Sequence, residues 1–184
     1  MSSVAPNEIS LSEATVKIAN GTLTSKALVQ SCLDRVNERN DIVQAWAFLD
    51  PDLALAQARE CDQQDAKGLL HGIPIAIKDI IDTADMPTEC NSPIYKDHRP
   101  KKDATVVKLL RNAGAVILGK TVTTEFASTF PGPTTNPHNP KHTPGGSSQG
   151  SGAAVADFMV QAALGTQTGG SVIRPNAYCG TDRS

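Results

Sequence analysis

The 184-residue sequence predicts an α/β fold in which some neighbouring strands pair in parallel. Two short apolar segments, 72–77 and 115–119, are rich in β-branched residues, as buried strands are. An amphipathic helical pattern over 104–113 separates them, and strand–helix–strand order is typical of parallel pairing. With 39% hydrophobic and 20% charged residues, the composition is that of a globular chain and excludes collagen-like or strongly disordered proteins.

Charge, hydropathy and cysteine pattern limit the location and partners of the protein. The formal net charge of −2 gives no basic surface for nucleic acid or for an anionic membrane. The N-terminus lacks the pattern of a secretory signal, and no segment reaches the roughly 18 apolar residues of a membrane span. The cysteines are scattered singly, so we expect reduced thiols in a cytoplasmic protein. They are Cys32, Cys61, Cys90 and Cys179.

Helical signals dominate the first seventy residues. A capping box, S-x-x-E at 10–13, starts one helix, and Gly21 stands where that helix should end. A second helix is expected to begin at 24–25, because the apolar residues that follow recur at helical spacing. An Asp-Pro pair at 50–51 opens a third. Residues 1–70 are therefore expected to form a helical lead-in.

The strand at 72–77 runs directly into Lys78, and a loop rich in Pro, Asp and Thr follows at 82–102. Asp103 is expected to cap the next helix, which Gly114 ends before the second strand. Several apolar residues of this helix suit packing on a sheet. They are Val106, Val107, Leu109, Leu110 and Ala113.

The segment 129–152 contains five prolines, which exclude a regular helix or strand and leave an ordered or a disordered loop. A helix and a strand are expected over 153–165, and a second glycine-rich segment follows. Ser147 and Ser171 lie in these two Gly-Ser segments, 24 residues apart. The helix–strand unit between them can bring both serines to the same end of a sheet.

Glycine-rich loops can direct consecutive N–H groups into one cavity, which then binds a phosphate or an oxyanion. The phosphate interpretation is weakened because GGSSQGSG contains no lysine and follows a loop instead of a strand. A flexible Gly/Ser linker is the third interpretation, although apolar helix and strand patterns flank the segment closely. From the residues alone, all three remain open.

An acyl-transfer site needs a base, because a serine hydroxyl must give up its proton. No G-x-S-x-G motif, typical of one class of serine hydrolases, is present. The last two histidines are four residues apart, but the proline between them argues against a pair of metal ligands on one helix. Besides the histidines, Lys78 is a candidate base, since burial lowers the pKa of a lysine. The alternative is a structural ion pair of Lys78 with Asp79 or Asp82. The histidines are His71, His98, His138 and His142.

Four segments of the chain resemble the amidase signature family of serine hydrolases, in the family's order and approximate spacing. The likeness covers roughly residues 9–180. It implies a mixed central β-sheet flanked by helices, with 1–184 as the N-terminal part of a single amidase signature domain. In it, 1–70 is the helical lead-in and 71–184 is the start of the catalytic α/β core. The segments are HGIPIAIKDIIDT, DATVVKLLRNAGAVILGKTVTTEFA, NPHNPKHTPGGSSQGSGAAVA and ALGTQTGGSVIRPNAYCG.

The family resemblance also implies a Ser-Ser-Lys triad and no metal or cofactor. Lys78 would take a proton from Ser147, and Ser147 would take one from the nucleophile Ser171, which attacks the amide carbonyl. Backbone N–H groups would stabilise the oxyanion. These belong to Thr168, Gly169, Gly170 and Ser171.

The chain departs from the family pattern at three places. Gln149 stands where the family has a small residue, and Asn176 replaces a residue that is usually alanine. The chain also ends thirteen residues after Ser171, whereas family members continue and supply most of the acyl pocket there. We therefore expect a truncated domain.

The resemblance predicts a hydrolase that cleaves carboxylic amides to an acid and ammonia or an amine through an acyl-enzyme. One alternative is the glutaminase-type A subunit of a glutamyl/aspartyl-tRNA amidotransferase, and another is a truncated, catalytically inactive amidase fragment. The expected partners are a small-molecule amide substrate and either a second copy in a homodimer or the partner subunits of an amidotransferase. A phosphate-binding module ranks last.

Overall fold

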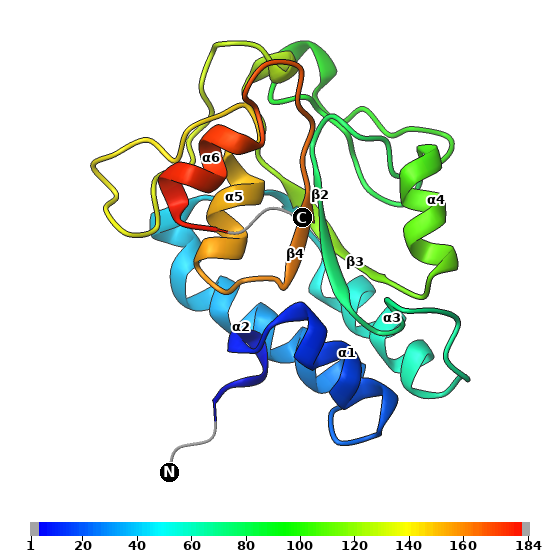
Figure 1. The fold of residues 1–184 in the computed structure, drawn as a ribbon. Helices are drawn as coiled ribbons and strands as arrows, with labels where there is room; N and C mark the ends of the chain where they lie inside the picture. Colours follow the sequence, from blue (N-terminus) through cyan, green and yellow to red (C-terminus); the bar gives the residue numbers. More distant parts are fainter. Residues whose placement is uncertain (1–3, 182–184) are drawn as a thin grey trace.

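A four-stranded mixed β-sheet lies at the centre of the computed structural model, which describes residues 4–181 (Figure 1). The strand order is β1-β3-β2-β4. β2 pairs in parallel with both β3 and β4, and β1 pairs antiparallel with β3. The predicted α/β class with a mixed sheet is confirmed. The strands are β1 (Trp46–Leu49), β2 (Pro74–Lys78), β3 (Val116–Thr121) and β4 (Ala162–Leu164).

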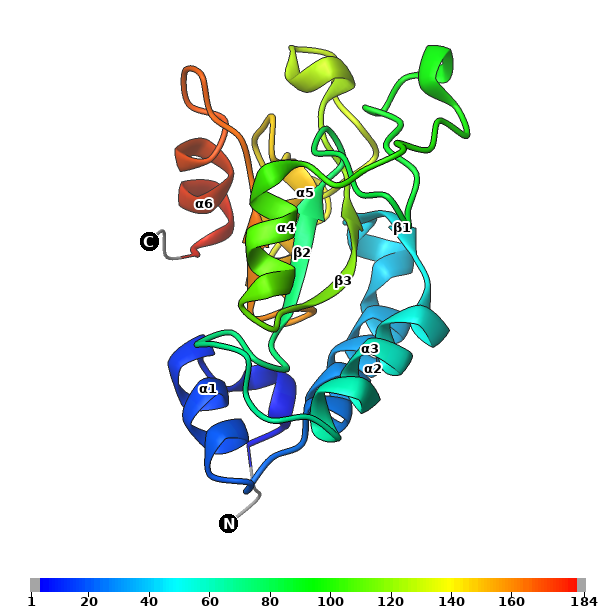
Figure 2. The same cartoon turned by 90° about the vertical axis from the view of Figure 1, so that its right-hand side faces the viewer.

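Helices cover both faces of the sheet. α4 lies over one face and α5 over the opposite face (Figure 2), and α5 contacts β2, β3 and β4. α3 packs against β3 and against α2. The helices are α1 (Leu11–Ala19), α2 (Ser25–Val43), α3 (Pro51–Asp62), α4 (Thr105–Asn112), α5 (Gln149–Ala156) and α6 (Ile173–Cys179), with 3-10 turns η1 (Pro6–Glu8), η2 (Pro93–Tyr95) and η3 (Glu125–Ala127). Within residues 4–181, no helix is both long and apolar enough to cross a membrane.

The first three helices begin at the predicted caps. The Ser10 hydroxyl accepts a hydrogen bond from the backbone N–H of Glu13, and α1 ends before Gly21, whose φ is +74°. Thr24 caps α2 and Asp50 caps α3 in the same way. Each side-chain oxygen satisfies an N–H group that the first helical turn leaves unpaired.

The expected helical lead-in also contains a strand. Gln44 ends α2 in the left-handed conformation, with φ of 52°, and β1 follows at once. β1 pairs with β3, and a Cβ on Gly119 would lie only 2.6 Å from the carbonyl oxygen of Phe48. β1 was not predicted, because four consecutive apolar residues carry no periodicity and only long-range pairing makes them a strand.

Asp103 does not cap α4, contrary to the prediction. Ala104 occupies the N-cap position without a side-chain bond. The Asp103 carboxylate instead accepts a hydrogen bond from the Ala84 N–H at 2.7 Å and one from Arg111 Nε at 3.1 Å. It therefore joins the loop after β2 to α4. The apolar face of α4 is also less buried than predicted, since Val107 is fully buried but Leu109 is 61% exposed.

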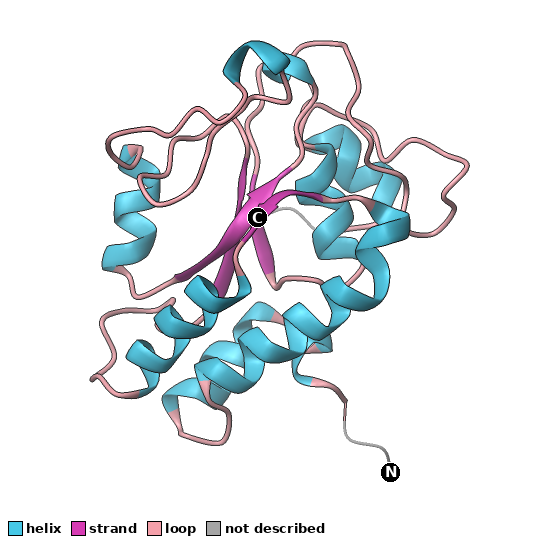
Figure 3. Cartoon of the chain, turned by 180° about the vertical axis from the view of Figure 1, so that it is seen from behind, coloured by secondary structure: helices cyan, strands magenta, loops and turns pink. Residues whose placement is uncertain are grey.

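The proline-rich segment is an ordered loop up to Ser148, and α5 begins at Gln149, four residues earlier than predicted, because no proline follows Pro144 in the segment. Thr134 Oγ1 donates to the carbonyl of Gln44 at 2.8 Å, and Asn136 Nδ2 donates to the carbonyl of Tyr178 at 2.9 Å. These bonds join the loop to the end of α2 and to α6. The long loops after β2, β3 and β4 gather at one end of the sheet (Figure 3), where ligands bind in α/β proteins.

Close packing of α5 on the sheet depends on Gly150. A Cβ at this position would lie 2.3 Å from the Ala45 carbonyl oxygen and 2.5 Å from the Val122 nitrogen. We expect Gly150→Ala to destabilise the fold by about 2–3 kcal/mol, because backbone must shift to admit the methyl group. Urea unfolding measures this change. Gly21→Ala is the control, since its Cβ meets no heavy atom within 4 Å and only φ strain of about 1 kcal/mol remains. Equal midpoints for the two variants would contradict the prediction.

Candidate active site

Lys78 is a fully buried amine at the carboxyl end of β2. Its Nζ lies 2.6 Å from Ser147 Oγ, 2.7 Å from Thr166 Oγ1 and 3.5 Å from the Thr166 carbonyl oxygen. Burial lowers the pKa of Lys78 from its ordinary value of 10.5 to about 8. The amine is therefore neutral in a substantial fraction of molecules near pH 8, as a lysine base requires.

Lys78 forms an ion pair with neither Asp79 nor Asp82, so this alternative is wrong. Asp79 pairs instead with Lys120 of β3, with 3.0 Å between Oδ1 and Nζ. Lys120 Nζ also donates to Thr88 Oγ1 at 2.6 Å. Asp79 Oδ1 accepts no well-aligned hydrogen bond, so its contact with Lys120 is mainly ionic. In the described part of the chain, Lys78 has no carboxylate within 4 Å.

Burial shifts both members of the Lys120–Asp79 pair toward their neutral forms. It lowers the pKa of Lys120 and raises that of Asp79, and the attraction between the two charges opposes both shifts. Asp79 Oδ2 also accepts a hydrogen bond from the Glu89 N–H at 3.1 Å. The pair thereby fixes the start of the loop that follows β2.

Ser147 follows a cis peptide bond from Gly146 and is 2% exposed. Its carbonyl oxygen accepts a hydrogen bond from the Thr124 N–H at 3.1 Å. Its hydroxyl contacts Lys78 Nζ. The loop after β3 and the side chain that ends β2 together fix the position of Ser147.

The two Gly-Ser loops lie side by side. The Ser148 N–H donates to the carbonyl oxygen of Ser171 at 3.0 Å. Ser148 Oγ accepts a bond from the Thr166 N–H and donates to the Thr166 carbonyl, both at 3.2 Å. Ser171 itself is half-buried, and its hydroxyl makes no hydrogen bond to any residue in the range 4–181.

The loop before Ser171 presents free backbone donors. Within the described residues, none of its four N–H groups at 168–171 donates to a protein acceptor. A Cβ on Gly169 or Gly170 would meet no heavy atom within 4 Å, so a ligand has access to the loop. Gln167 Oε1 accepts the next two N–H groups, of Val172 and Ile173, each at 2.9 Å. The loop can therefore donate several hydrogen bonds to one anionic oxygen.

Other polar residues named from the sequence lie outside this arrangement. His71 Nε2 lies 3.0 Å from the Cys61 carbonyl, and His138 Nε2 lies 2.8 Å from the Cys179 carbonyl, so both bind backbone. Gln149 is 2% exposed, and its Nε2 has no partner among the described residues. No group of three or more His, Cys, Asp or Glu side chains within 4–181 could hold a metal ion.

Sequence reasoning missed Thr166 and Lys120. Thr166 follows β4 by two residues, and only the fold brings it to Lys78. A signal for Lys120 was present, because it follows the apolar run AVILG in a strand that is buried along its whole length. A lysine in such a strand needs a carboxylate partner or a lowered pKa.

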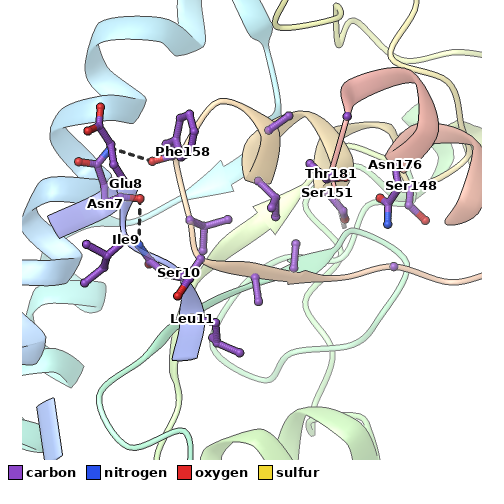
Figure 4. A pocket seen from close by; sticks show the side chains of 18 of the residues that line it. Asn7, Glu8, Ile9, Ser10, Leu11, Ser148, Ser151, Phe158, Asn176 and Thr181 are labelled. Carbon is purple, nitrogen blue, oxygen red and sulfur yellow. Dashed lines mark hydrogen bonds between the residues drawn. The ribbon is translucent and has the colours of Figure 1, made fainter. Parts of the chain in front are cut away.

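A cavity of about 640 Å³ opens along β4, next to the candidate site (Figure 4). Ser148, Ser151 and Asn176 lie at one end of it, and Asn7 and Phe158 lie at the other. Neither Lys78, Ser147 nor Ser171 lines this cavity. It adjoins the candidate site through Ser148 and through Gly165 and Val172, which are the chain neighbours of Thr166 and Ser171.

The mixed sheet, with a buried lysine and two serine loops at one end, defines the class of the protein as the amidase signature fold. The chain belongs to the amidase family, whose model, named Amidase, matches residues 27–181. The resemblance stated from the sequence motifs is thereby confirmed.

Similar proteins include amidotransferase subunits and amidases. The chain is 44% identical over 185 residues to the A subunit of the glutamyl-tRNA(Gln) amidotransferase of Natranaerobius thermophilus, an alignment that covers 95% of this chain and 38% of that protein. It superposes on the peptide amidase from Stenotrophomonas maltophilia with a TM-score of 0.86 and 37% identity, over 92% of this chain and 38% of that one. Fatty acid amide hydrolase gives a TM-score of 0.88 at 30% identity, over 95% and 33%. The chain spans about 38% of the length of the curated relatives that it matches.

Proposed function

We propose that the chain carries the Ser-Ser-Lys triad of an amidase-type hydrolase that cleaves carboxylic amides to an acid and ammonia or an amine. The observation that carries the proposal is the 2.6 Å contact between Lys78 Nζ and Ser147 Oγ. It joins a buried, carboxylate-free lysine to a serine beside the Ser171 loop. A lysine in this environment is poised to accept a proton near neutral pH.

The proposed reaction uses groups of this chain and water. Neutral Lys78 takes the proton of Ser147, Ser147 takes that of Ser171, and Ser171 Oγ attacks the carbonyl carbon of the amide. The N–H groups of 168–171 stabilise the resulting oxyanion, to which each such donor contributes about 3 kcal/mol. The proton returns along the same relay to the leaving nitrogen. Water then hydrolyses the acyl-enzyme.

A second candidate is the glutaminase-type A subunit of a glutamyl/aspartyl-tRNA amidotransferase. The observation in its favour is the 44% identity to the glutamyl-tRNA(Gln) amidotransferase protein, against 37% and 30% for the two amide-cleaving enzymes of known structure named above. Glutamine is itself a carboxylic amide, so the same triad serves both candidates. The second candidate function implies partner subunits of an amidotransferase, and the first implies a second copy of this chain in a homodimer. The described cysteines are free thiols, which supports a cytoplasmic site of action.

A fluorophosphonate probe followed by an ammonia assay tests the proposal. We expect the 184-residue chain to be labelled at Ser171, located by peptide mass spectrometry. Ammonia release is then compared between glutamine and simple aliphatic and aryl amides. Preference for glutamine supports the amidotransferase candidate, and preference for the other amides supports a general amidase. A folded chain that is neither labelled nor active would overturn the proposal in favour of an inactive fragment.

A further inference from the structure

Three oxygen atoms surround the buried amine of Lys78, and two of them belong to Thr166. Ser147 Oγ lies at 2.6 Å, Thr166 Oγ1 at 2.7 Å and the Thr166 carbonyl oxygen at 3.5 Å. In the proposed relay only Ser147 exchanges a proton with Lys78. The two Thr166 oxygens therefore need a different explanation.

The stereochemistry of a neutral amine supplies that explanation. Neutral lysine carries two N–H bonds and one lone pair, and it accepts a proton only along the lone pair. For Lys78 to act as a base toward Ser147, both N–H bonds must point elsewhere. Thr166 offers two acceptors other than Ser147, its hydroxyl and its carbonyl oxygen.

We propose that Thr166 is a positioning residue that binds the N–H groups of Lys78 and so aims its lone pair at Ser147. The inference rests on the proposed function and adds a residue to it. Without the Thr166 hydroxyl, only the longer contact to the Thr166 carbonyl oxygen at 3.5 Å remains, so the amine donates an N–H to Ser147 in part of the population. In that orientation Ser147 cannot pass its proton to Lys78.

Thr166 is itself held in place by contacts that do not involve Lys78. Its N–H and its carbonyl oxygen both bond to Ser148 Oγ at 3.2 Å. The same Ser148 bonds through its N–H to the Ser171 carbonyl oxygen at 3.0 Å. A Cβ on Gly165 would lie 2.8 Å from Ser148 Oγ, so the turn before Thr166 packs closely on this serine. Ser148 thereby ties Thr166 to the segments that carry both serines of the relay.

The charged groups near Lys78 do not compete with this orientation. Asp79 is adjacent in the chain and Lys120 lies on the neighbouring strand β3, and these two side chains pair with each other. β4 and α5 also pack against β2 and contain no charged residue, and no carboxylate of α2, another helix that contacts β2, lies within 4 Å of Lys78 Nζ. Thr166 and Ser147 are the hydrogen-bond partners of Lys78 Nζ among the described residues.

Thr166→Val tests the proposal, because valine keeps the shape of threonine and removes Oγ1. We expect kcat for amide hydrolysis to fall about 100-fold with KM nearly unchanged, since proton transfer and not substrate binding is impaired. Loss of an acceptor destabilises the ammonium form more than the amine. The acidic limb of the pH–rate profile should therefore move to lower pH. Thr166→Ser, which restores the hydroxyl, should recover both kcat and the limb.

Thr134→Val is the matched control. Thr134 is buried, whereas Thr166 is half-buried, and Thr134 Oγ1 donates to the backbone carbonyl of Gln44, outside the site. We expect this variant to lose some stability and to keep the wild-type pH profile. Thr166→Val with wild-type kcat, or with a lowered kcat and an unmoved acidic limb, would overturn the inference.

A readout that does not require turnover separates this inference from the proposed function. NMR titration of the Lys78 13Cε signal in selectively labelled chain reports its protonation directly. We expect the pH at the midpoint of this Lys78 titration to be lower in Thr166→Val than in the wild type and to return to the wild-type value in Thr166→Ser. An unchanged midpoint in Thr166→Val argues against the inference even if wild-type chain is labelled by the probe. A chain that shows the shift but is never labelled would contradict the proposed function alone.

Discussion

Replacing Ser171 with alanine is expected to abolish fluorophosphonate labelling and to lower amide turnover on the order of 10⁶-fold, since loss of a nucleophile in a comparable relay has that effect. The fold should survive the change. Ser171 is half-buried, and its hydroxyl bonds to no other residue between 4 and 181. Unfolding by urea should therefore give a midpoint close to that of the wild type. Ser171→Ala chain that still takes up the probe would show that the nucleophile is a different residue.

Ser151→Ala provides the matched control for Ser171→Ala. Its hydroxyl lies 2.7 Å from Thr121 Oγ1 and donates to the Leu164 carbonyl at 3.0 Å, so it joins α5 to β3 and β4. We expect this variant to lose about 1–2 kcal/mol of stability and to keep full labelling. The two variants then separate the chemistry of a serine from its structural role in neighbouring loops.

Sequence patterns predicted the parts of the fold that local physics determines. The caps at Ser10, Thr24 and Asp50 lie where they were expected, because each bond spans only three residues. β1 was missed because its partner β3 lies some seventy residues further along the chain. Asp103 has the residue type of a cap, but tertiary contacts to Ala84 and Arg111 determine its role instead.

The residues of the candidate site, like the elements of the fold, could be predicted only in part from the sequence. Lys78 could be identified from an apolar strand that ends in a lysine, and the serines from their glycine-rich surroundings. The competing partners for the Lys78 amine, an aspartate (Asp79 or Asp82) and Ser147, could not be ranked without the fold. The pleat of β2 sends Asp79 to Lys120, and the turn after β4 brings Thr166 to Lys78. The direction of these side chains therefore excludes an ion pair between Lys78 and Asp79.

Amide hydrolysis should rise with pH in proportion to the neutral fraction of Lys78. With a pKa of about 8, about one-tenth of the amine is neutral at pH 7 and about nine-tenths at pH 9. Activity measured across this range should therefore increase about tenfold and reach a plateau above pH 9. A profile that falls between pH 7 and 9 would require a protonated Lys78 and would exclude it as the base. The same pKa shift predicts how stability depends on pH. The Lys78 amine binds its proton more tightly in the unfolded chain, where its pKa is 10.5, than in the folded chain, where it is about 8. The contribution of Lys78 to the free energy of unfolding therefore rises from pH 8 to 10.5.

Replacing each buried lysine with methionine should separate function from stability. Lys78→Met removes the base, so we expect a loss of at least about 10³-fold in turnover and no remaining rise between pH 7 and 9. Its unfolding free energy should change little, because relief from burying an amine offsets two lost hydrogen bonds. Lys120→Met leaves the Asp79 carboxylate buried without its counter-charge, which costs about 3–5 kcal/mol. Urea unfolding of both variants, beside the pH–rate profile of the folded one, checks the contrast. If Lys78→Met proved the less stable of the two, Lys78 would act mainly as a structural residue.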